Sequence, residues 1–74
     1  MSKKSLENLT KYSKLFEKYR NFLTQNQQQL FQLYFYQDLS YAEVAEIVAT
    51  TRTSVYDTIK HTIQKLDKLE EKMH

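Results

Sequence analysis

The sequence predicts an all-α fold of four helices, the last of them long. The 74 residues contain no glycine and no proline, on which hairpins and β-sandwiches depend. Apolar residues recur at spacings of three and four, as on one face of a helix. Two pairs of residues have the spacing of a capping box, which starts a helix. We expect a single domain with helices at about residues 5–22, 25–37, 41–48 and 52–72.

The first helix is predicted by a broad apolar stripe within a basic segment. Residues 1–20 hold six basic and two acidic side chains, whereas residues 21–50 hold three acids and no base. Basic residues of the first helix could therefore add phosphate contacts to a nucleic-acid site. The stripe follows helical spacing and consists of Leu9, Tyr12, Phe16, Tyr19 and Leu23, widened by Leu6, Leu15 and Phe22.

The second helix begins at a capping box and becomes apolar along its length. Thr24 precedes Gln27 by three residues, so each side chain can bind a backbone N–H of the first turn. The segment from Leu30 to Tyr36 is apolar or aromatic nearly all round, which indicates a central buried element. Its expected core residues are Leu30, Leu33 and Tyr34.

Ser40 to Lys60 has the layout of a helix-turn-helix. Ser40 and Glu43 form a second capping box, and Leu39 with Val44 supplies the accompanying hydrophobic staple. The turn Ala49-Thr50-Thr51 follows, with Thr51 as the expected N-cap of the next helix. Two helices joined by so short a turn place the second against a groove or a partner.

The second helix of this motif separates an inner from an outer face. Val55 and Ile59 turn inward by helical spacing, and the polar side chains lie opposite. Because such a face can contact phosphates and base edges, we expect a nucleic-acid site here. Its candidate residues are Arg52, Thr53, Tyr56 and Lys60.

Each candidate also has a structural interpretation. Arg52 could pair with Glu46 instead of phosphate, and Tyr56 could pack at a helix interface. Asp57, on the same face, repels phosphate; it could accept from a cytosine amino group, but a bond to a neighbouring helix is the favoured interpretation. The formal net charge of the chain is only +2, which is low for a strong DNA-binding protein.

Beyond the motif, the last helix continues with an apolar seam, which a partner helix would have to bury. That partner could be Leu6–Leu15 of the same chain or a second copy of the seam. We slightly favour the second copy, hence a homodimer, because isolated projecting helices are marginal. The seam residues are Ile63, Leu66, Leu69 and Met73.

Composition excludes several classes of function. The chain has no cysteine, and two scattered histidines do not make a metal site, so we expect no metal and no cofactor. No catalytic constellation or glycine-rich phosphate loop is present, which argues against an enzyme. No apolar run approaches membrane-spanning length and nothing resembles a signal peptide. We therefore expect a soluble cytoplasmic protein without membrane insertion.

The stretch from Leu23 to Thr62 closely resembles the YlxM family of small bacterial helix-turn-helix proteins and, more distantly, sigma factor region 4. The resemblance covers about residues 9–74. The chain departs from the family pattern at Ala49, usually glycine, at Thr50, usually aliphatic, and at Thr58, usually asparagine. Ala49 must then adopt a strained turn or a slightly different one. The matching positions are Leu23, Thr24, Gln27, Leu33–Phe35, Asp38–Ser40, Glu43, Ala45, Glu46, Arg52, Val55–Asp57, Ile59 and Lys60.

The resemblance implies a nucleic-acid-binding regulatory protein with a helical extension after the recognition helix. Members of the family are encoded beside genes for the signal recognition particle and its receptor, which implies an accessory role in that pathway. The ligand would be DNA or structured RNA. The alternative is a dimeric adaptor that joins proteins without nucleic acid, and a narrower option is a sigma-like promoter reader.

Overall fold

The computed structural model describes residues 6–73. These residues contain four α-helices and no strand. This arrangement confirms the predicted all-α class with a long C-terminal helix. Ser5, which the pattern assigned to the first helix, lies outside the described residues. In chain order the elements are α1 (Leu6–Tyr19), the 3₁₀ turn η1 (Arg20–Phe22), α2 (Gln25–Phe31), the π-helical turn η2 (Gln32–Tyr36), α3 (Tyr41–Ile47) and α4 (Arg52–Met73).

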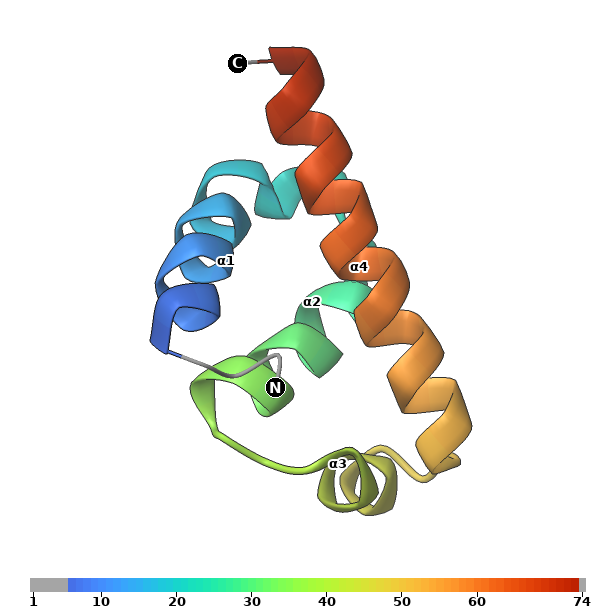
Figure 1. Cartoon of the computed structure of the whole chain (residues 1–74). Helices are drawn as coiled ribbons and strands as arrows, with labels where there is room; N and C mark the ends of the chain where they lie inside the picture. The colour runs from blue at the N-terminus through green and yellow to red at the C-terminus, as the bar shows by residue number, and fades with distance from the viewer. Residues whose placement is uncertain (1–5, 74) are drawn as a thin grey trace.

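The longest element, α4, organises the molecule. Its 22 residues extend for about 33 Å at 1.5 Å per residue, close to the 36 Å long dimension of the molecule. α4 packs against α1, α2 and α3. Figure 1 shows α1 beside its C-terminal half and α3 near its N-terminal end, with α2 between them. The two halves of α4 therefore meet different neighbours.

The core is aromatic where α1 meets α2. Phe16 and Phe31 are fully buried and stack with their ring centroids 4.4 Å apart. Phe35 stacks on the other side of Phe31 at 4.5 Å. Large rings fill space with little loss of conformational entropy, which suits a chain of this length. The remaining fully buried aliphatic side chains come from α2, α3 and α4: Leu30, Val44, Val55, Ile59 and Leu66.

Both capping boxes form as the sequence predicts. The backbone N–H of Gln27 donates to Thr24 Oγ1 at 3.1 Å, and the N–H of Thr24 donates to Gln27 Oε1 at 3.0 Å. Ser40 and Glu43 exchange the same two bonds at 3.1 and 2.9 Å. Each box satisfies backbone donors that have no partner inside the helix, so α2 and α3 begin where the local sequence dictates.

At two turns, residues other than glycine adopt a positive φ. Asp38 and Ala49 both have a positive φ of 57°. Asp38 tolerates this region better than most residues. Ala49 ends α3 in a Schellman arrangement: its N–H donates to the Glu46 carbonyl, and the N–H of Thr50 donates to the Ala45 carbonyl at 2.9 Å. The strained turn expected at Ala49 is therefore present and costs about 1 kcal/mol.

Two aromatic or aliphatic positions differ from the expected pattern. Phe22 is 50% exposed, because α1 ends at Tyr19 and the tighter η1 turn rotates this ring away from the core. Leu23 is buried in its place. Leu33 is only partly buried, whereas the consecutive Tyr34 and Phe35 both enter the core through the wider π turn of η2.

Candidate nucleic-acid interface

The helix-turn-helix consists of α3 and the N-terminal half of α4. Val44 of α3 and Val55 and Ile59 of α4 are fully buried against each other and the core. Thr51 caps α4, since its Oγ1 accepts a hydrogen bond from the N–H of Ser54 at 3.1 Å. The cap, the Schellman turn and this apolar contact together fix the outer face of α4 relative to α3.

All four candidate contact residues lie on that outer face and are exposed. Arg52, Thr53 and Tyr56 line one shallow groove of about 470 Å³, which Ser40, Tyr41 and Ala42 of α3 complete. Lys60 lies one heptad beyond Thr53, and therefore on nearly the same side of the helix. The residues that the sequence suggested are thus brought to one surface.

Three tyrosines support the wall of this groove. Tyr41 stacks on the buried Tyr34 with ring centroids 4.6 Å apart and the planes nearly parallel. Tyr56 meets Tyr41 edge to face at 5.5 Å. Tyr56 consequently packs at the interface between α3 and α4 while 40% of its surface stays exposed. The packing interpretation of this residue is therefore observed, and the nucleic-acid contact of its exposed side remains a prediction.

The alternative roles of the charged residues on this face are not observed. Within residues 6–73, no ion pair joins Arg52 to Glu46, and no hydrogen bond joins Asp57 to a neighbouring helix. Both side chains are exposed. Asp57 therefore places a negative charge between the candidate contact residues, which reduces the electrostatic attraction of this half of α4 for phosphate.

The C-terminal half of α4 is held to α1 by two side-chain clusters, which we call the Lys-Tyr clamps. In the first, Tyr12 Oη donates to Asp67 Oδ2 at 3.1 Å, and Lys11 Nζ lies 3.6 Å from Asp67 Oδ1. In the second, Tyr19 Oη donates to Glu70 Oε1 at 2.7 Å, and Lys18 Nζ donates to the same oxygen at 3.2 Å. Each clamp therefore pairs one acid of α4 with one base of α1.

The clamps shift the titration of their members upward. Burial and the hydrogen bond to Asp67 raise the pKa of Tyr12, and the bond to Glu70 raises the pKa of Tyr19. The pKa of Lys11 is raised by Tyr12 and Asp67, and that of Lys18 mainly by Glu70. Both lysines also lie over the ring of the neighbouring tyrosine, at 5.0 and 5.2 Å from its centroid.

The seam predicted on the last helix packs largely within the chain. Ile63 and Leu66 are buried, and Leu69 is partly buried against the core. α1 of the same chain supplies the partner helix. For these three residues, the structure therefore supports packing within the chain and not the favoured packing against a second copy. Met73 is 56% exposed and remains available. A homodimer remains a prediction.

The clamps also change the expected role of the first helix. Lys11 and Lys18 are engaged with acids of α4, and Arg20 lies over the Phe16 ring at 5.2 Å. Of the described bases of α1, Lys14 alone has no such contact. These contacts reduce the positive charge that α1 offers to phosphate, and the expected phosphate contacts of the first helix remain a prediction.

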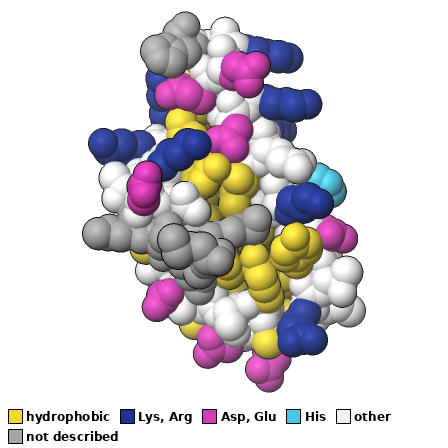
Figure 2. Space-filling model, in the orientation of Figure 1, with side chains coloured by type: hydrophobic (Ala, Val, Ile, Leu, Met, Phe, Trp, Pro, Cys, Tyr) yellow, Lys and Arg dark blue, Asp and Glu magenta, His cyan; other side chains and the backbone are white. Residues whose placement is uncertain are grey.

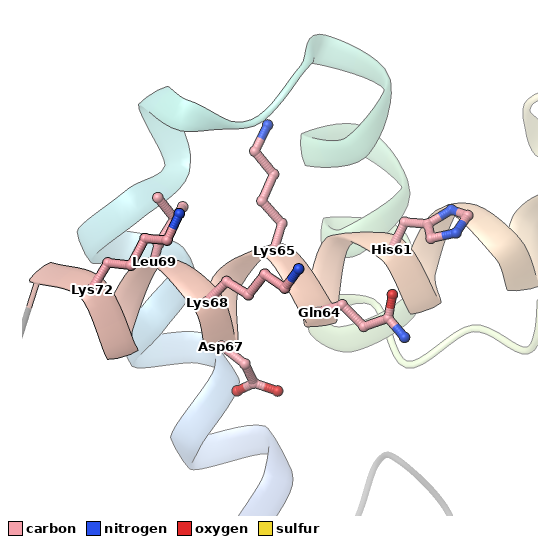
Figure 3. A pocket seen from close by; sticks show the side chains of 7 residues that line it. All are labelled: His61, Gln64, Lys65, Asp67, Lys68, Leu69 and Lys72. Carbon is pink, nitrogen blue, oxygen red and sulfur yellow. The ribbon is translucent and has the colours of Figure 1, made fainter.

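A basic surface that the sequence reasoning missed lies on the C-terminal half of α4. It surrounds a shallow hollow of about 680 Å³ along the outside of the helix. Figure 3 shows its side chains along α4, with Lys68 and Gln64 extending on one side and Lys65 on another. The sequence signal for this surface is the spacing of four, three and four residues between successive basic side chains. The residues that make up this basic ridge are His61, Lys65, Lys68 and Lys72.

Charges of both signs are distributed over the face seen in Figure 2. Basic side chains lie along the right-hand edge with the histidine and also on the left, and acidic side chains lie along the lower edge near α3 and also near the top and on the right. No group of three His, Cys, Asp or Glu residues within 6–73 could hold a metal ion. In the same range, every helix is too short or too polar to cross a bilayer.

Comparison with known proteins gives a consistent result. A family model described as "Putative helix-turn-helix protein, YlxM / p13 like" (UPF0122) matches residues 6–74. The chain is 42% identical over 69 residues to a UPF0122 protein of Mycoplasma capricolum, covering 93% of this chain and 61% of that protein. It is 43% identical over 68 residues to UPF0122 proteins of Bacillus cereus and Bacillus anthracis, covering 92% of this chain and 62% of each. The chain therefore spans about three fifths of the length of these relatives. No solved structure matches it significantly.

Proposed function

Because the chain belongs to the YlxM/p13-like helix-turn-helix family, we propose that it binds nucleic acid and acts as a regulatory protein, not as an enzyme. The observation that carries this proposal is the exposed outer face of α4, where Arg52, Thr53, Tyr56 and Lys60 lie opposite the buried Val55 and Ile59. In a helix-turn-helix, the helix that enters a DNA groove is anchored on one side and polar on the other.

The residues of the face have distinct roles in the proposal. Arg52 and Lys60 contact phosphates at the two ends of the face, about 12 Å apart along the helix axis at 1.5 Å per residue. Thr53 and Tyr56 lie between them and reach the backbone or base edges. The low charge of the face implies modest affinity with a strong dependence on the few cations present.

The resemblance to a family encoded beside signal-recognition-particle genes suggests where this binding operates. We propose an accessory role in that pathway, in the cytoplasm, with the RNA of the particle or duplex DNA as ligand. The test therefore includes both nucleic acids.

The experiment compares the wild type with Arg52→Ala/Lys60→Ala by fluorescence anisotropy, using labelled duplex DNA and labelled particle RNA at several salt concentrations. Loss of two phosphate contacts should lower the slope of log affinity against log salt by about 2 on duplex DNA. Circular dichroism checks that the helices remain intact. If the wild type binds neither nucleic acid in a salt-dependent manner, the proposal is wrong.

A second candidate is a dimeric adaptor that docks proteins. It is favoured by large apolar side chains that the fold leaves exposed, among them Phe22 at 50%, Ile47 at 58% and Met73 at 56%. They lie on different helices, so they do not form the continuous seam that a coiled-coil dimer requires. The nucleic-acid function is therefore preferred.

A further inference from the structure

We propose that the basic ridge on the C-terminal half of α4 is a second phosphate-contacting surface, which follows the backbone of a duplex whose groove receives the N-terminal half. This inference rests on the proposed function and adds its second surface. The ridge consists of His61, Lys65, Lys68 and Lys72.

The first support is the placement of the ridge relative to the helix-turn-helix face. At 100° per residue, Lys68 is rotated from Lys60 by about 80° around α4, and Lys72 by about 120°. The ridge therefore flanks the outer face and does not continue it. When a helix lies in a groove, the side chains that flank its inserted face are those next to the phosphate strands.

The second support is the way acids and bases are separated around this half of α4. Asp67 and Glu70 bond to α1 through the Lys-Tyr clamps, and Asp67 also lines the edge of the hollow beside the ridge. Lys68 and Lys72 are exposed, and neither takes part in an ion pair within residues 6–73. Internal pairing thus engages two of the three acids of this half, while Glu71 stays exposed, and it leaves Lys68 and Lys72 available to an external anion.

The third support is the mutual repulsion of the ridge. Lys65 and Lys68 are three residues apart, and Lys68 and Lys72 are four apart, so neighbouring cations face each other on the helix surface. Like charges at these spacings destabilise a helix. A polyanion with closely spaced phosphates relieves this repulsion, because several cations can be neutralised by one strand.

A phosphodiester backbone fits the ridge better than an anionic membrane does. A helix that lies on a membrane needs an exposed apolar face beside its basic one. The apolar residues of this half, Ile63 and Leu66, are buried against α1 and the core. The remaining apolar side chain in the hollow, Leu69, is partly buried. The surface is thus charged without the apolar area that insertion requires.

The test compares two charge-matched double variants, Lys68→Gln/Lys72→Gln on the ridge and Lys11→Gln/Lys18→Gln in the clamps. Binding to labelled duplex DNA is measured by fluorescence anisotropy over a series of salt concentrations. The ridge variant should lower the slope of log affinity against log salt by about 2, since each phosphate contact contributes about 0.9. The clamp variant should leave the slope unchanged while its thermal midpoint falls. Circular dichroism verifies that both variants are helical.

The outcomes separate this inference from the proposed function. If the wild type binds duplex and the ridge variant keeps the full slope, the ridge is not a phosphate surface, although the helix-turn-helix face still binds. Equal losses in both variants would also overturn the inference, because they would reflect total charge. Without salt-dependent binding by the wild type, both proposals fall. Vesicles containing anionic lipid form the last arm: tighter binding to them than to duplex, lost in the ridge variant, would assign the ridge to a membrane and overturn the inference.

Discussion

The two halves of α4 form one continuous helix, but each half is held in position by different contacts. The N-terminal half is positioned by local devices, namely the Thr51 cap and the turn at Ala49, and its exposed face is nearly neutral. The C-terminal half is positioned by a remote element, α1, through buried Leu66 and the Lys-Tyr clamps, and its exposed face is basic. The helix-turn-helix motif therefore identifies the shape of the binding element, but most of the available positive charge lies beyond the motif.

The comparison also shows that formal charge per segment is a poor guide to available charge. Residues 1–20 have the largest basic excess of the sequence, whereas residues 51–74 have five bases against four acids. Among residues 6–73, folding changes the available charge, because Asp67 and Glu70 engage Lys11 and Lys18, whereas Lys68 and Lys72 have no acidic partner there. The predictions below test how independently the two halves are held.

The largest effect is expected where the C-terminal half meets the core. Leu66→Ala removes a fully buried side chain and should lower the free energy of unfolding by about 2–5 kcal/mol. Met73→Ala, at the exposed end of the same seam, should change it by less than about 0.5 kcal/mol. Urea unfolding followed by circular dichroism measures both.

Sedimentation of the same two variants tests the predicted dimer. If the seam joined two chains, Met73→Ala would weaken association at unchanged stability of the monomer. Similar, small losses of stability in the two variants would contradict the packing of Leu66 against α1.

An intermediate effect is expected at the start of the N-terminal half. Thr51→Ala removes the side-chain acceptor for the Ser54 N–H and should cost about 1 kcal/mol of stability. Thr53→Ala, two residues later on the exposed face, is the matched control and should shift stability by less than about 0.5 kcal/mol. Thermal unfolding resolves this difference. A cost at Thr51 no larger than that at Thr53 would show that local capping does not position this half.

The smallest effect concerns the clamps at alkaline pH. The pKa values of Tyr12 and Tyr19 are raised above the usual 10.0, so folding favours the protonated phenols. Their contribution to stability is complete below about pH 10 and is lost as the pH rises through the raised values. Tyr12→Phe/Tyr19→Phe should therefore show a shallower loss of stability above pH 10 than the wild type, by urea unfolding at pH 8 to 11.

The stability of each protein at pH 8 is the reference for this loss. An equally steep alkaline loss in the double variant would mean that the clamps do not contribute to docking α4 on α1.

What the sequence could predict was local. The capping boxes at Thr24 and Ser40, the inward turn of Val55 and the strained Ala49 all depend on residues within one or two helical turns. Such features follow from spacing and side-chain chemistry alone. The candidate contact face was predictable for the same reason, since inner and outer positions alternate along one helix.

What the sequence could not predict depends on partners far along the chain. Tyr12 and Asp67 are separated by 55 residues and Tyr19 and Glu70 by 51, so no local pattern shows that they meet. Phe22 left the expected stripe because a 3₁₀ turn changes the angle per residue, which composition does not reveal. The basic ridge is not evident from the sequence, because Asp67 and Glu70 stand beside its lysines in the chain and engage α1 only in the folded protein.

The 55-residue separation within the first clamp has a consequence for the protein during its synthesis. A ribosome that adds ~5–20 residues per second needs ~3–11 s to extend the chain from Tyr12 to Asp67. Phe31, the stacking partner of Phe16, lies only 15 residues further along the chain. The acids that Lys11 and Lys18 engage are added much later. The residues that join α1 to α2 are therefore synthesised well before those that clamp α1 to α4.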